Sequence, residues 1–363
     1  MKILVDGMPR IVGGIGSLIL NIAEISKERK DAVEFVFLIS AHSAYIPMLE
    51  KNGYRYFIVP RVKAVKQYKK FLRNIFTDNY FDYLWFNNTS KVNIILPEVA
   101  KKVGGAKIIT HPHGVDCEEK GIKKILFKVL DRINENKMYS LVDIPFACSE
   151  QVADVYYRNK AELRKKTTII KNGILVSKFQ YSEKSRENIR ADLKCEDSDV
   201  LLGAVGRLTH VKNYPFIINM LKGMNFKYKL IIVGEGEDQS QLTKLIEEEG
   251  LENRCFLLGK KSNVNEYLCA MDYFLLPSFN EGMPYSIIEA QASGIKCIVS
   301  DTLSKELGVT DLVEFVSIKD NRAWRMVIEN KLPNPDRYKY TDAIKKLGYD
   351  VEDTYDLFRK NVN

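Results

Sequence analysis

The amino-acid sequence predicts an α/β protein made of two doubly wound, Rossmann-like parallel sheets that follow one another along the chain. Apolar runs of strand length alternate with amphipathic runs of helix length, which is typical of parallel sheets covered by helices on both faces. The chain has 363 residues, which is long for a single core. In such sheets ligands bind outside the carboxyl ends of the strands, so we expect the two domains to face a central cleft.

The strand candidates fall into two sets. The first set comprises residues 3–5, 34–39, 56–59, 83–86, 107–109, 144–147 and 168–170. The second set comprises residues 200–205, 229–233, 254–258, 273–276, 296–299 and 314–316. A break near Asn172-Gly173, followed by the polar residues 181–198, separates them. We therefore predict one domain over residues 1–173, a second over 174–344, and a final helix at about 345–363.

Composition indicates a reduced, cytoplasmic protein. Residues 1–7 read as a buried strand and a glycine loop, without the charged start and apolar stretch of a signal peptide. No apolar run approaches the roughly 18 residues of a spanning helix, so any membrane contact should be peripheral. The net charge of +8 is too small to indicate nucleic-acid binding. The six cysteines lack C-x-x-C spacing and are interpreted as reduced: Cys117, Cys148, Cys195, Cys255, Cys269 and Cys297.

Positive charge concentrates between Arg61 and Phe76. This segment contains no acidic residue, and its apolar members recur at helical spacing, at Val65, Tyr68, Leu72 and Ile75. One interpretation is a surface helix with a solvated basic face. The other is a helix that docks peripherally on an anionic membrane surface, at the inner face of the cell membrane.

The strongest functional signal follows the predicted strand at residues 273–276. Glu281-Gly282 falls in the loop at the carboxyl end of this strand, and Glu289 lies about one turn inside the helix predicted over residues 286–293. Both acids can face one ligand, and the first amides of the helix suit a phosphate. The alternative interpretation is that the acids only cap the helix.

A second signal follows the predicted strand at residues 200–205. Arg207 comes at the end of this strand, and Lys212 with Asn213 opens the next helix. Two cations at such a point suit a diphosphate, which gains charge as a glycosidic bond breaks. The alternative is a pair of ordinary surface cations.

The third signal is the glycine loop Gly13-Gly14-Ile15-Gly16, between the first strand and a helix predicted over residues 18–27. Glycines let the backbone approach a ligand closely, and helix-start amides suit an anion. The loop matches the dinucleotide fingerprint only loosely, and the second strand ends in Ser40-Ala41-His42 without the acid that NAD binding needs. Nicotinamide chemistry is therefore disfavoured.

The fourth signal is His111-Pro112-His113-Gly114, after the strand at residues 107–109. The two histidines are compatible with a metal site, with a packing role or with hydrogen bonds to a sugar; no carboxylate or cysteine cluster accompanies them in the sequence. Asp197-Ser198-Asp199 has the D-x-D form of metal-dependent sugar transferases, but it precedes a strand. We interpret it as a solvated polar linker.

These motifs together resemble glycosyltransferase family 4, whose members have the GT-B fold of two facing Rossmann-like domains. The resemblance covers nearly the whole chain, and the two glutamates show the E-x7-E spacing of the family. The run Phe279 to Gly294, followed by Ser300-Asp301-Thr302, is most similar to transferases of bacterial capsule and exopolysaccharide assembly. The resemblance implies an acceptor domain at residues 1–173, completed by the C-terminal helix, and a nucleotide-sugar donor domain at residues 174–344.

The resemblance also implies roles for individual residues. Arg207 and Lys212 would bind the donor diphosphate, Glu289 the ribose, and Glu281 the transferred sugar. The amides of Gly282 and Met283 would lie along sugar and phosphate, and Val264 near the base. Gly14 and Gly16 would present the glycine loop to the diphosphate, and His113 would bond the donor sugar. His111 matches less well, and Leu175 replaces the acid that usually follows Asn-Gly-Ile.

The implied activity is that of a retaining, metal-independent glycosyltransferase of the hexosyltransferase type. It would use a nucleotide-diphosphate sugar, with UDP the commonest choice in the family, and a glycan or lipid-linked oligosaccharide acceptor. No cofactor and no metal are expected. Two alternatives remain: a nucleotide-sugar epimerase on the same fold, and a non-catalytic nucleotide-sugar binding module.

Overall fold

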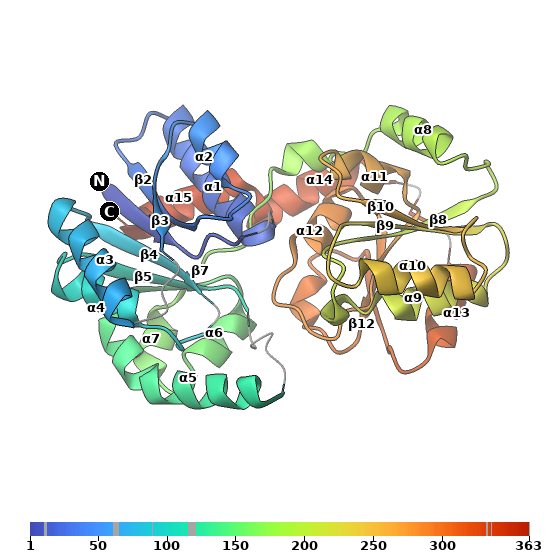
Figure 1. Ribbon diagram of the computed structural model, residues 1–363. Coiled ribbons are helices and arrows are strands. Elements are labelled where there is room, and N and C mark those ends of the chain that lie inside the picture. Colours follow the sequence, from blue (N-terminus) through green and yellow to red (C-terminus); the bar gives the residue numbers. More distant parts are fainter. Residues whose placement is uncertain are drawn as a thin grey trace. The chain divides into compact units, whose positions relative to one another are not determined.

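The computed structural model describes residues 1–10, 13–60, 65–88, 90–114, 121–331, 333–334 and 336–362. Within it the chain forms two compact units (Figure 1). Unit 1 contains Met1–Gly173 and Val351–Asn363, and unit 2 contains Ile174–Asp350. The chain therefore passes between the units twice, after Gly173 and after Asp350.

Unit 1 is built on a parallel sheet of seven strands in the order β3-β2-β1-β4-β5-β6-β7. The strands are β1 Lys2–Asp6, β2 Glu34–Ser40, β3 Arg55–Val59, β4 Tyr83–Asn88, β5 Lys107–Pro112, β6 Val142–Ala147 and β7 Thr168–Ile169. The helices are α1 Gly14–Glu28, α2 Ile46–Lys51, α3 Val65–Asp78, α4 Ile95–Lys102, α5 Gly121–Leu141, α6 Glu150–Tyr156, α7 Ala161–Lys166 and α15 Val351–Val362.

Unit 2 is built on a parallel sheet of six strands in the order β10-β9-β8-β11-β12-β13. The strands are β8 Val200–Val205, β9 Tyr228–Val233, β10 Cys255–Gly259, β11 Tyr273–Leu276, β12 Lys296–Ser300 and β13 Val313–Val316. The helices are α8 Glu183–Asp192, α9 Tyr214–Lys222, α10 Gln239–Glu248, α11 Val264–Ala270, α12 Tyr285–Ala292, α13 Asn321–Asn330 and α14 Lys339–Ile344. Both predicted doubly wound sheets are confirmed.

Alternation along the strands divides the core of unit 1 into two layers. Leu4 of β1 joins a buried cluster with Leu72 and Phe76 of α3, on one face of the sheet. On the other face, α15 packs against α1. Phe358 of α15 is fully buried, with its ring centroid 4.6 Å from that of Trp85 and 5.9 Å from that of Phe146. Helices therefore cover both faces of the sheet (Figure 1).

The basic segment forms α3 from Val65 onward, and residues 61–64 of that segment lie outside the described residues. Its apolar face is used for packing, since Leu72, Ile75 and Phe76 are buried and α3 contacts α4. Val65, which helical spacing assigns to this face, is instead 59% exposed because it lies at the first turn, before the packed part of the helix. Among the described residues, no helix combines the length and apolarity needed to cross a membrane.

Candidate active site

The predicted donor residues of unit 2 lie at the carboxyl edge of its sheet. The strand order reverses between β8 and β11, which are neighbours in space. At such a point the loops leaving the two strands diverge and leave a crevice, which is where doubly wound sheets bind ligands. The loop after β8 carries Arg207 and leads to Lys212, and the loop after β11 carries Glu281.

Three polar contacts tie these two loops together. The Asn213 side-chain amide donates to the Pro277 carbonyl at 3.2 Å, and the Phe279 amide donates to the Val211 carbonyl at 2.9 Å. The Lys212 Nζ lies 2.7 Å from Glu281 Oε1, and both side chains are largely buried. Asn213 adopts a left-handed conformation, with φ of 52°, that turns the chain from Lys212 into α9. Lys212 and Glu281 therefore form a charge-compensated pair, held in place by the hydrogen bonds between their two loops.

Two glycines let the ends of β8 and β9 approach one another closely beside this pair. Gly206 and Gly234 have φ of 157° and 153°, in a region that L side chains rarely adopt. A Cβ on Gly234 would lie 1.9 Å from the carbonyl oxygen of Gly206, and a Cβ on Gly206 would lie 2.9 Å from the Tyr214 hydroxyl. Larger residues at either position would push apart the ends of β8 and β9.

Arg207 differs from Lys212 in having no compensating group. Its side chain is exposed and has no hydrogen bond or ion pair within the described part of the chain. A guanidinium at the end of a strand with all of its donors available is suited to bind an anion in bidentate fashion. The structure thus provides one engaged cation, Lys212, and one available cation, Arg207, on the same short loop.

Glu289 lies in the second turn of α12, partly buried. Burial raises the pKa of its carboxyl to about 7, although the positive charge of Lys178 acts in the opposite direction. Gly282 and Met283 occupy the loop that enters α12, with Met283 buried. Val264 is the first residue of α11, which follows β10, and it is half-buried. All predicted unit 2 residues therefore lie on loops or helices that follow strand ends.

The predicted unit 1 residues lie at the corresponding edge of the other sheet. Helix α1 begins at Gly14, directly after the loop residue Gly13. The Tyr45 hydroxyl accepts from the Gly13 amide and donates to the Gly13 carbonyl, both at 2.8 Å. A Cβ on Gly16 would lie 2.3 Å from the Tyr45 ring. Glycine at position 16 is thus required by a packed tyrosine, and Tyr45 holds the loop in shape.

His113 is held at the end of β5 by a residue that sequence analysis missed. The His113 Nε2 lies 3.0 Å from Asn87 Oδ1, and the Asn87 amide donates to the Asp6 carbonyl at 3.0 Å. Asn87 therefore bridges β1 and His113 across the point where the unit 1 strand order reverses. Burial lowers the pKa of His113 to about 4, although its hydrogen bond with Asn172 acts in the opposite direction. The ring is neutral at pH 7.

His111 faces the core of unit 1. Its ring is fully buried, stacks on Trp85 with centroids 6.1 Å apart, and lies 3.3 Å from the Ile170 carbonyl through Nε2. Three roles were left open for the two histidines, and the buried position of His111 assigns it the packing role. No cluster of three or more histidine, cysteine, aspartate or glutamate side chains suited to a metal occurs within the described ranges.

The D-x-D segment lies before β8, at the opposite end of the sheet from Glu281. Asp197 and Ser198 are exposed, but Asp199 is not a solvated linker residue, so the interpretation was wrong for Asp199. Its side chain is 7% exposed, and Oδ2 lies 2.7 Å from Lys229 Nζ and accepts from the Glu196 amide at 2.7 Å. The Asp199 carboxylate binds both the Glu196 amide and Lys229, and these contacts hold the turn that leads into β8.

Comparisons with known proteins find glycosyltransferases similar to this chain. Residues 185–329 match the family of glycosyl transferases group 1. The chain is 23% identical over 367 residues to EpsF of Bacillus subtilis (strain 168), which is named as a glycosyltransferase, covering 96% of this chain and 92% of EpsF. It is 28% identical over 220 residues to the UDP-Gal:alpha-D-GlcNAc-diphosphoundecaprenol alpha-1,3-galactosyltransferase of Escherichia coli, covering 57% of this chain and 55% of that enzyme.

A solved structure shows the same fold over the whole chain. The structure of HepE (Alr3699) from Anabaena in complex with UDP superimposes with a TM-score of 0.81 at 18% identity, covering 99% of both chains. Two doubly wound domains of this kind define the GT-B class. The chain is a glycosyltransferase with a group 1 domain in unit 2, and it is similar to the bacterial polysaccharide glycosyltransferases.

Replacing Gly234 by alanine should cost more than about 3 kcal/mol in the free energy of unfolding, because both its φ and its contact with the Gly206 carbonyl exclude a Cβ. Gly250 is the matched control. It has a φ of 64° and no atom within 4 Å of its Cβ position, so Gly250→Ala should cost only about 1 to 2 kcal/mol. Urea unfolding measures both. Equal costs would contradict the close approach of β8 and β9.

Replacing Glu289 by glutamine should remove a pH dependence of stability. Because the folded-state pKa of Glu289 is raised from 4.5 to about 7, the native state keeps a proton that the unfolded state releases between these values. Wild-type stability should fall by about 1 to 3 kcal/mol as pH rises through this window, relative to Glu289→Gln. Thermal unfolding at pH 4.5, 6 and 8 measures it, with Glu187→Gln on the exposed side of α8 as the control. A constant difference between wild type and Glu289→Gln across this range would argue against a buried carboxyl.

Proposed function

We propose that this protein is a retaining, metal-independent glycosyltransferase of family 4 and of the hexosyltransferase type. It transfers a sugar from a UDP-sugar to a glycan or lipid-linked oligosaccharide during capsule or exopolysaccharide biosynthesis. The observation that carries the proposal is the Lys212–Glu281 pair at the point of strand reversal, with the available guanidinium of Arg207 on the same loop.

The donor binds to unit 2 through its diphosphate. Arg207 supplies a free cation, whereas Lys212 is shared between the phosphate and the Glu281 carboxylate 2.7 Å away. This sharing places a carboxylate beside a phosphate without net repulsion, because Lys212 compensates both. Glu281 is then free to accept hydrogen bonds from hydroxyls of the transferred sugar.

The other donor contacts come from elements that follow strand ends. The amides of Gly282 and Met283, at the entry to α12, lie along the sugar and the phosphate. Glu289 accepts hydrogen bonds from the ribose, and Val264 lies near the base. In unit 1, the loop of Gly14 and Gly16 approaches the diphosphate, and His113 contacts the donor sugar. Residues 1–173 with the C-terminal helix form the acceptor domain, and residues 174–344 form the donor domain.

The transfer proceeds by front-face displacement at the anomeric carbon. The bond between that carbon and the diphosphate oxygen breaks, the acceptor oxygen forms the new glycosidic bond on the same face, and the departing phosphate oxygen takes the acceptor proton. Arg207 and Lys212 stabilise the negative charge that develops on the diphosphate. Glu281 orients the sugar and forms no covalent bond to it. The neutral ring of His113 serves as a hydrogen-bond partner, since its pKa of about 4 keeps it uncharged.

The choice of donor and acceptor rests on the relatives. HepE was solved with UDP bound, and the Escherichia coli relative is named for a UDP-galactose donor and a diphosphoundecaprenol acceptor. Such an acceptor is embedded in a membrane through its lipid, so the transferase works in the cytoplasm at the inner membrane face. The basic segment from Arg61 to Phe76, whose described part belongs to α3, contributes attraction to anionic lipid there through the exposed Lys66, Lys70 and Arg73.

A thermal-shift panel of nucleoside diphosphates tests donor binding without an acceptor. UDP and UDP-sugars should raise the melting temperature in a concentration-dependent manner, because a ligand that binds only the native state stabilises it by mass action. GDP, dTDP and NAD are the comparison ligands. Stabilisation by NAD alone, or by none of the panel, would contradict the proposed donor site. A new nucleotide-sugar formed from the donor alone would indicate an epimerase, and binding without turnover a non-catalytic module.

Replacing Arg207 by alanine should lower turnover of the UDP-sugar about 100-fold to 1000-fold, as for the loss of one preorganised donor to a developing anion. The fold should be unaffected, because the side chain is exposed and makes no contact with a partner in the described structure. Arg322→Ala removes another exposed arginine of unit 2 and is the control. Donor hydrolysis measures both variants. Wild-type turnover in Arg207→Ala would remove this residue from the mechanism.

A further inference from the structure

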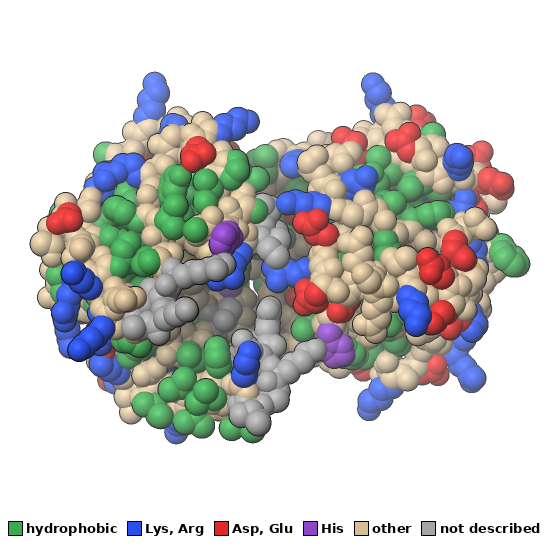
Figure 2. Space-filling view, viewed as in Figure 1, with side chains coloured by type: hydrophobic (Ala, Val, Ile, Leu, Met, Phe, Trp, Pro, Cys, Tyr) green, Lys and Arg blue, Asp and Glu red, His purple; other side chains and the backbone are tan. Residues whose placement is uncertain are grey.

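Helix α5 exposes a stripe of large aliphatic side chains to solvent. Ile125 is 66% exposed, Leu126 54%, Val129 49% and Ile133 68%. Their spacing of one, three and four residues places them on one face over about two turns of the helix. Figure 2 shows hydrophobic side chains gathered on the lower edge of unit 1, where α5 runs in Figure 1. Such a face on a globular helix ordinarily packs against the core.

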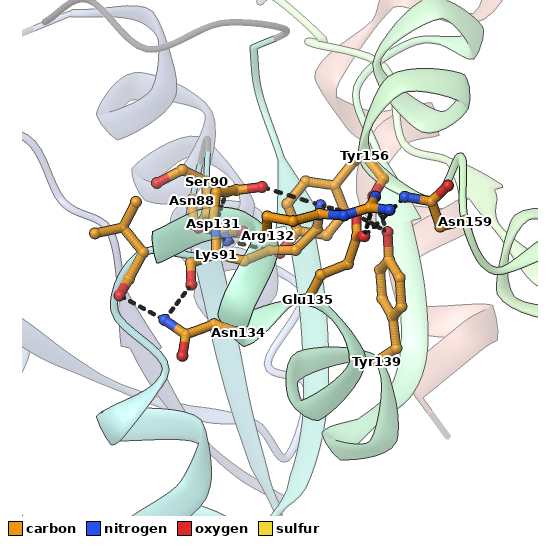
Figure 3. Close-up of polar contacts among 11 residues, drawn as sticks. Asn88, Ser90, Lys91, Asp131, Arg132, Asn134, Glu135, Tyr139, Tyr156 and Asn159 are labelled. Atoms are coloured by element: carbon orange, nitrogen blue, oxygen red, sulfur yellow. Dashed lines mark hydrogen bonds and ion pairs between the residues drawn. The ribbon is translucent and has the colours of Figure 1, made fainter. Parts of the chain in front are cut away.

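The opposite face of α5 is held by a buried polar network, drawn in Figure 3. Lys91 and Glu135 are both 3% exposed, with Lys91 Nζ 3.2 Å from Glu135 Oε1 and 3.5 Å from Asp131 Oδ2. The Tyr139 hydroxyl donates to Glu135 Oε1 at 2.9 Å. The Asn134 amide donates to the carbonyls of Lys91 at 3.0 Å and Val92 at 2.9 Å.

This network sets the rotation of α5 about its own axis. Asp131, Glu135 and Tyr139 recur every four residues on the inner face, so the helix cannot turn without breaking the contacts to Lys91. A buried ion pair contributes little to net stability, but removing one partner is strongly destabilising because the other charge stays buried and unpaired. The inner face of α5 is thus taken up by these polar contacts and by the buried Met138 and Leu141, and the aliphatic stripe points outward.

Basic side chains border the stripe. Lys123 and Lys128 are exposed and have no partner within the described ranges, and Arg132 is 65% exposed beside its ion pair with Glu135. Aliphatic residues flanked by lysines and arginines match an anionic bilayer, where acyl chains lie beneath negatively charged headgroups. A symmetric contact with a second copy of the chain would instead bring the same lysines together.

We propose that α5 docks unit 1 on an anionic membrane surface, with Ile125, Leu126, Val129 and Ile133 inserted at the boundary between headgroups and acyl chains. Lys123, Lys128 and Arg132 then contact lipid phosphates. This role is distinct from that of α3, whose large apolar residues Leu72, Ile75 and Phe76 are buried and which offers mainly charge. The inference does not depend on the proposed donor, acceptor or transfer chemistry.

Vesicle co-sedimentation of the full chain tests the inference. The protein should bind vesicles of phosphatidylglycerol and phosphatidylcholine at low salt, and binding should weaken as salt is added. The double variant I125D/I133D should lower the partition coefficient at least about tenfold, because it removes two inserted side chains. Met326→Asp is the matched control, since Met326 is 61% exposed on α13 of unit 2.

A charge series separates α5 from general electrostatic attraction. K123E/K128E should weaken vesicle binding much more than K165E/K166E, which makes the same charge change on exposed residues of α7 in the same unit. UDP-dependent thermal stabilisation serves as the readout of the donor site, and all these variants should retain whatever stabilisation the wild type shows. Failure of membrane docking and failure of the proposed donor site are thus recorded by different measurements.

Insertion itself is followed with Leu126→Trp. Both native tryptophans, Trp85 and Trp324, are fully buried, so a blue shift of emission on adding vesicles reports the new side chain. Vesicle binding equal in the wild type and I125D/I133D, or absent in the wild type, would overturn the proposal. A wild-type dimer that I125D/I133D converts to a monomer, in sedimentation velocity without lipid, would assign the stripe to self-association instead.

Discussion

The reversal of strand order between β8 and β11 is the constraint on which the unit 2 site depends. Parallel strands place all their carboxyl ends at one edge, and at a reversal the two outgoing chains turn away from each other. Lys212 and Glu281, 69 residues apart in the sequence, meet there at 2.7 Å. Each charge compensates the other in this largely buried place, where an unpaired charge would be costly.

The strand order of unit 1 also reverses once, but an asparagine and not an ion pair connects the residues at that point. Its reversal point, between β1 and β4, is bridged by Asn87, which bonds the Asp6 carbonyl and His113. Burial raises the pKa of Asp6 to about 6 and lowers that of His113 to about 4. Both shifts favour the uncharged form. At pH 7 His113 is therefore neutral, whereas Asp6 is still largely ionised.

Helix α5 shows how a polar network directs an apolar surface. Asp131 and Glu135 pair with Lys91 on the inner face, beside the buried core residue Met138. Because these charges compensate one another, they hold the inner face without using Ile125, Leu126, Val129 or Ile133. The outer face is then available for an apolar environment outside the protein. A basic helix such as α3, with its apolar side packed against α4, has no comparable surface.

The sequence by itself determined the strand pattern, the two sheets and the positions of the site residues relative to strand ends. These features are local, because alternating apolar runs and glycines at strand ends each act within a few residues. Tertiary structure decided which side chains touch. Tyr45 against Gly16, Asn87 against His113 and Lys91 against Glu135 are pairs separated by 26 to 44 positions along the chain. No periodicity encodes such pairs, because they depend on which strands become neighbours and on how each helix is rotated. For the same reason, the inner histidine His111 and the turn residue Asp199 could be placed only once the core and the strand ends were formed.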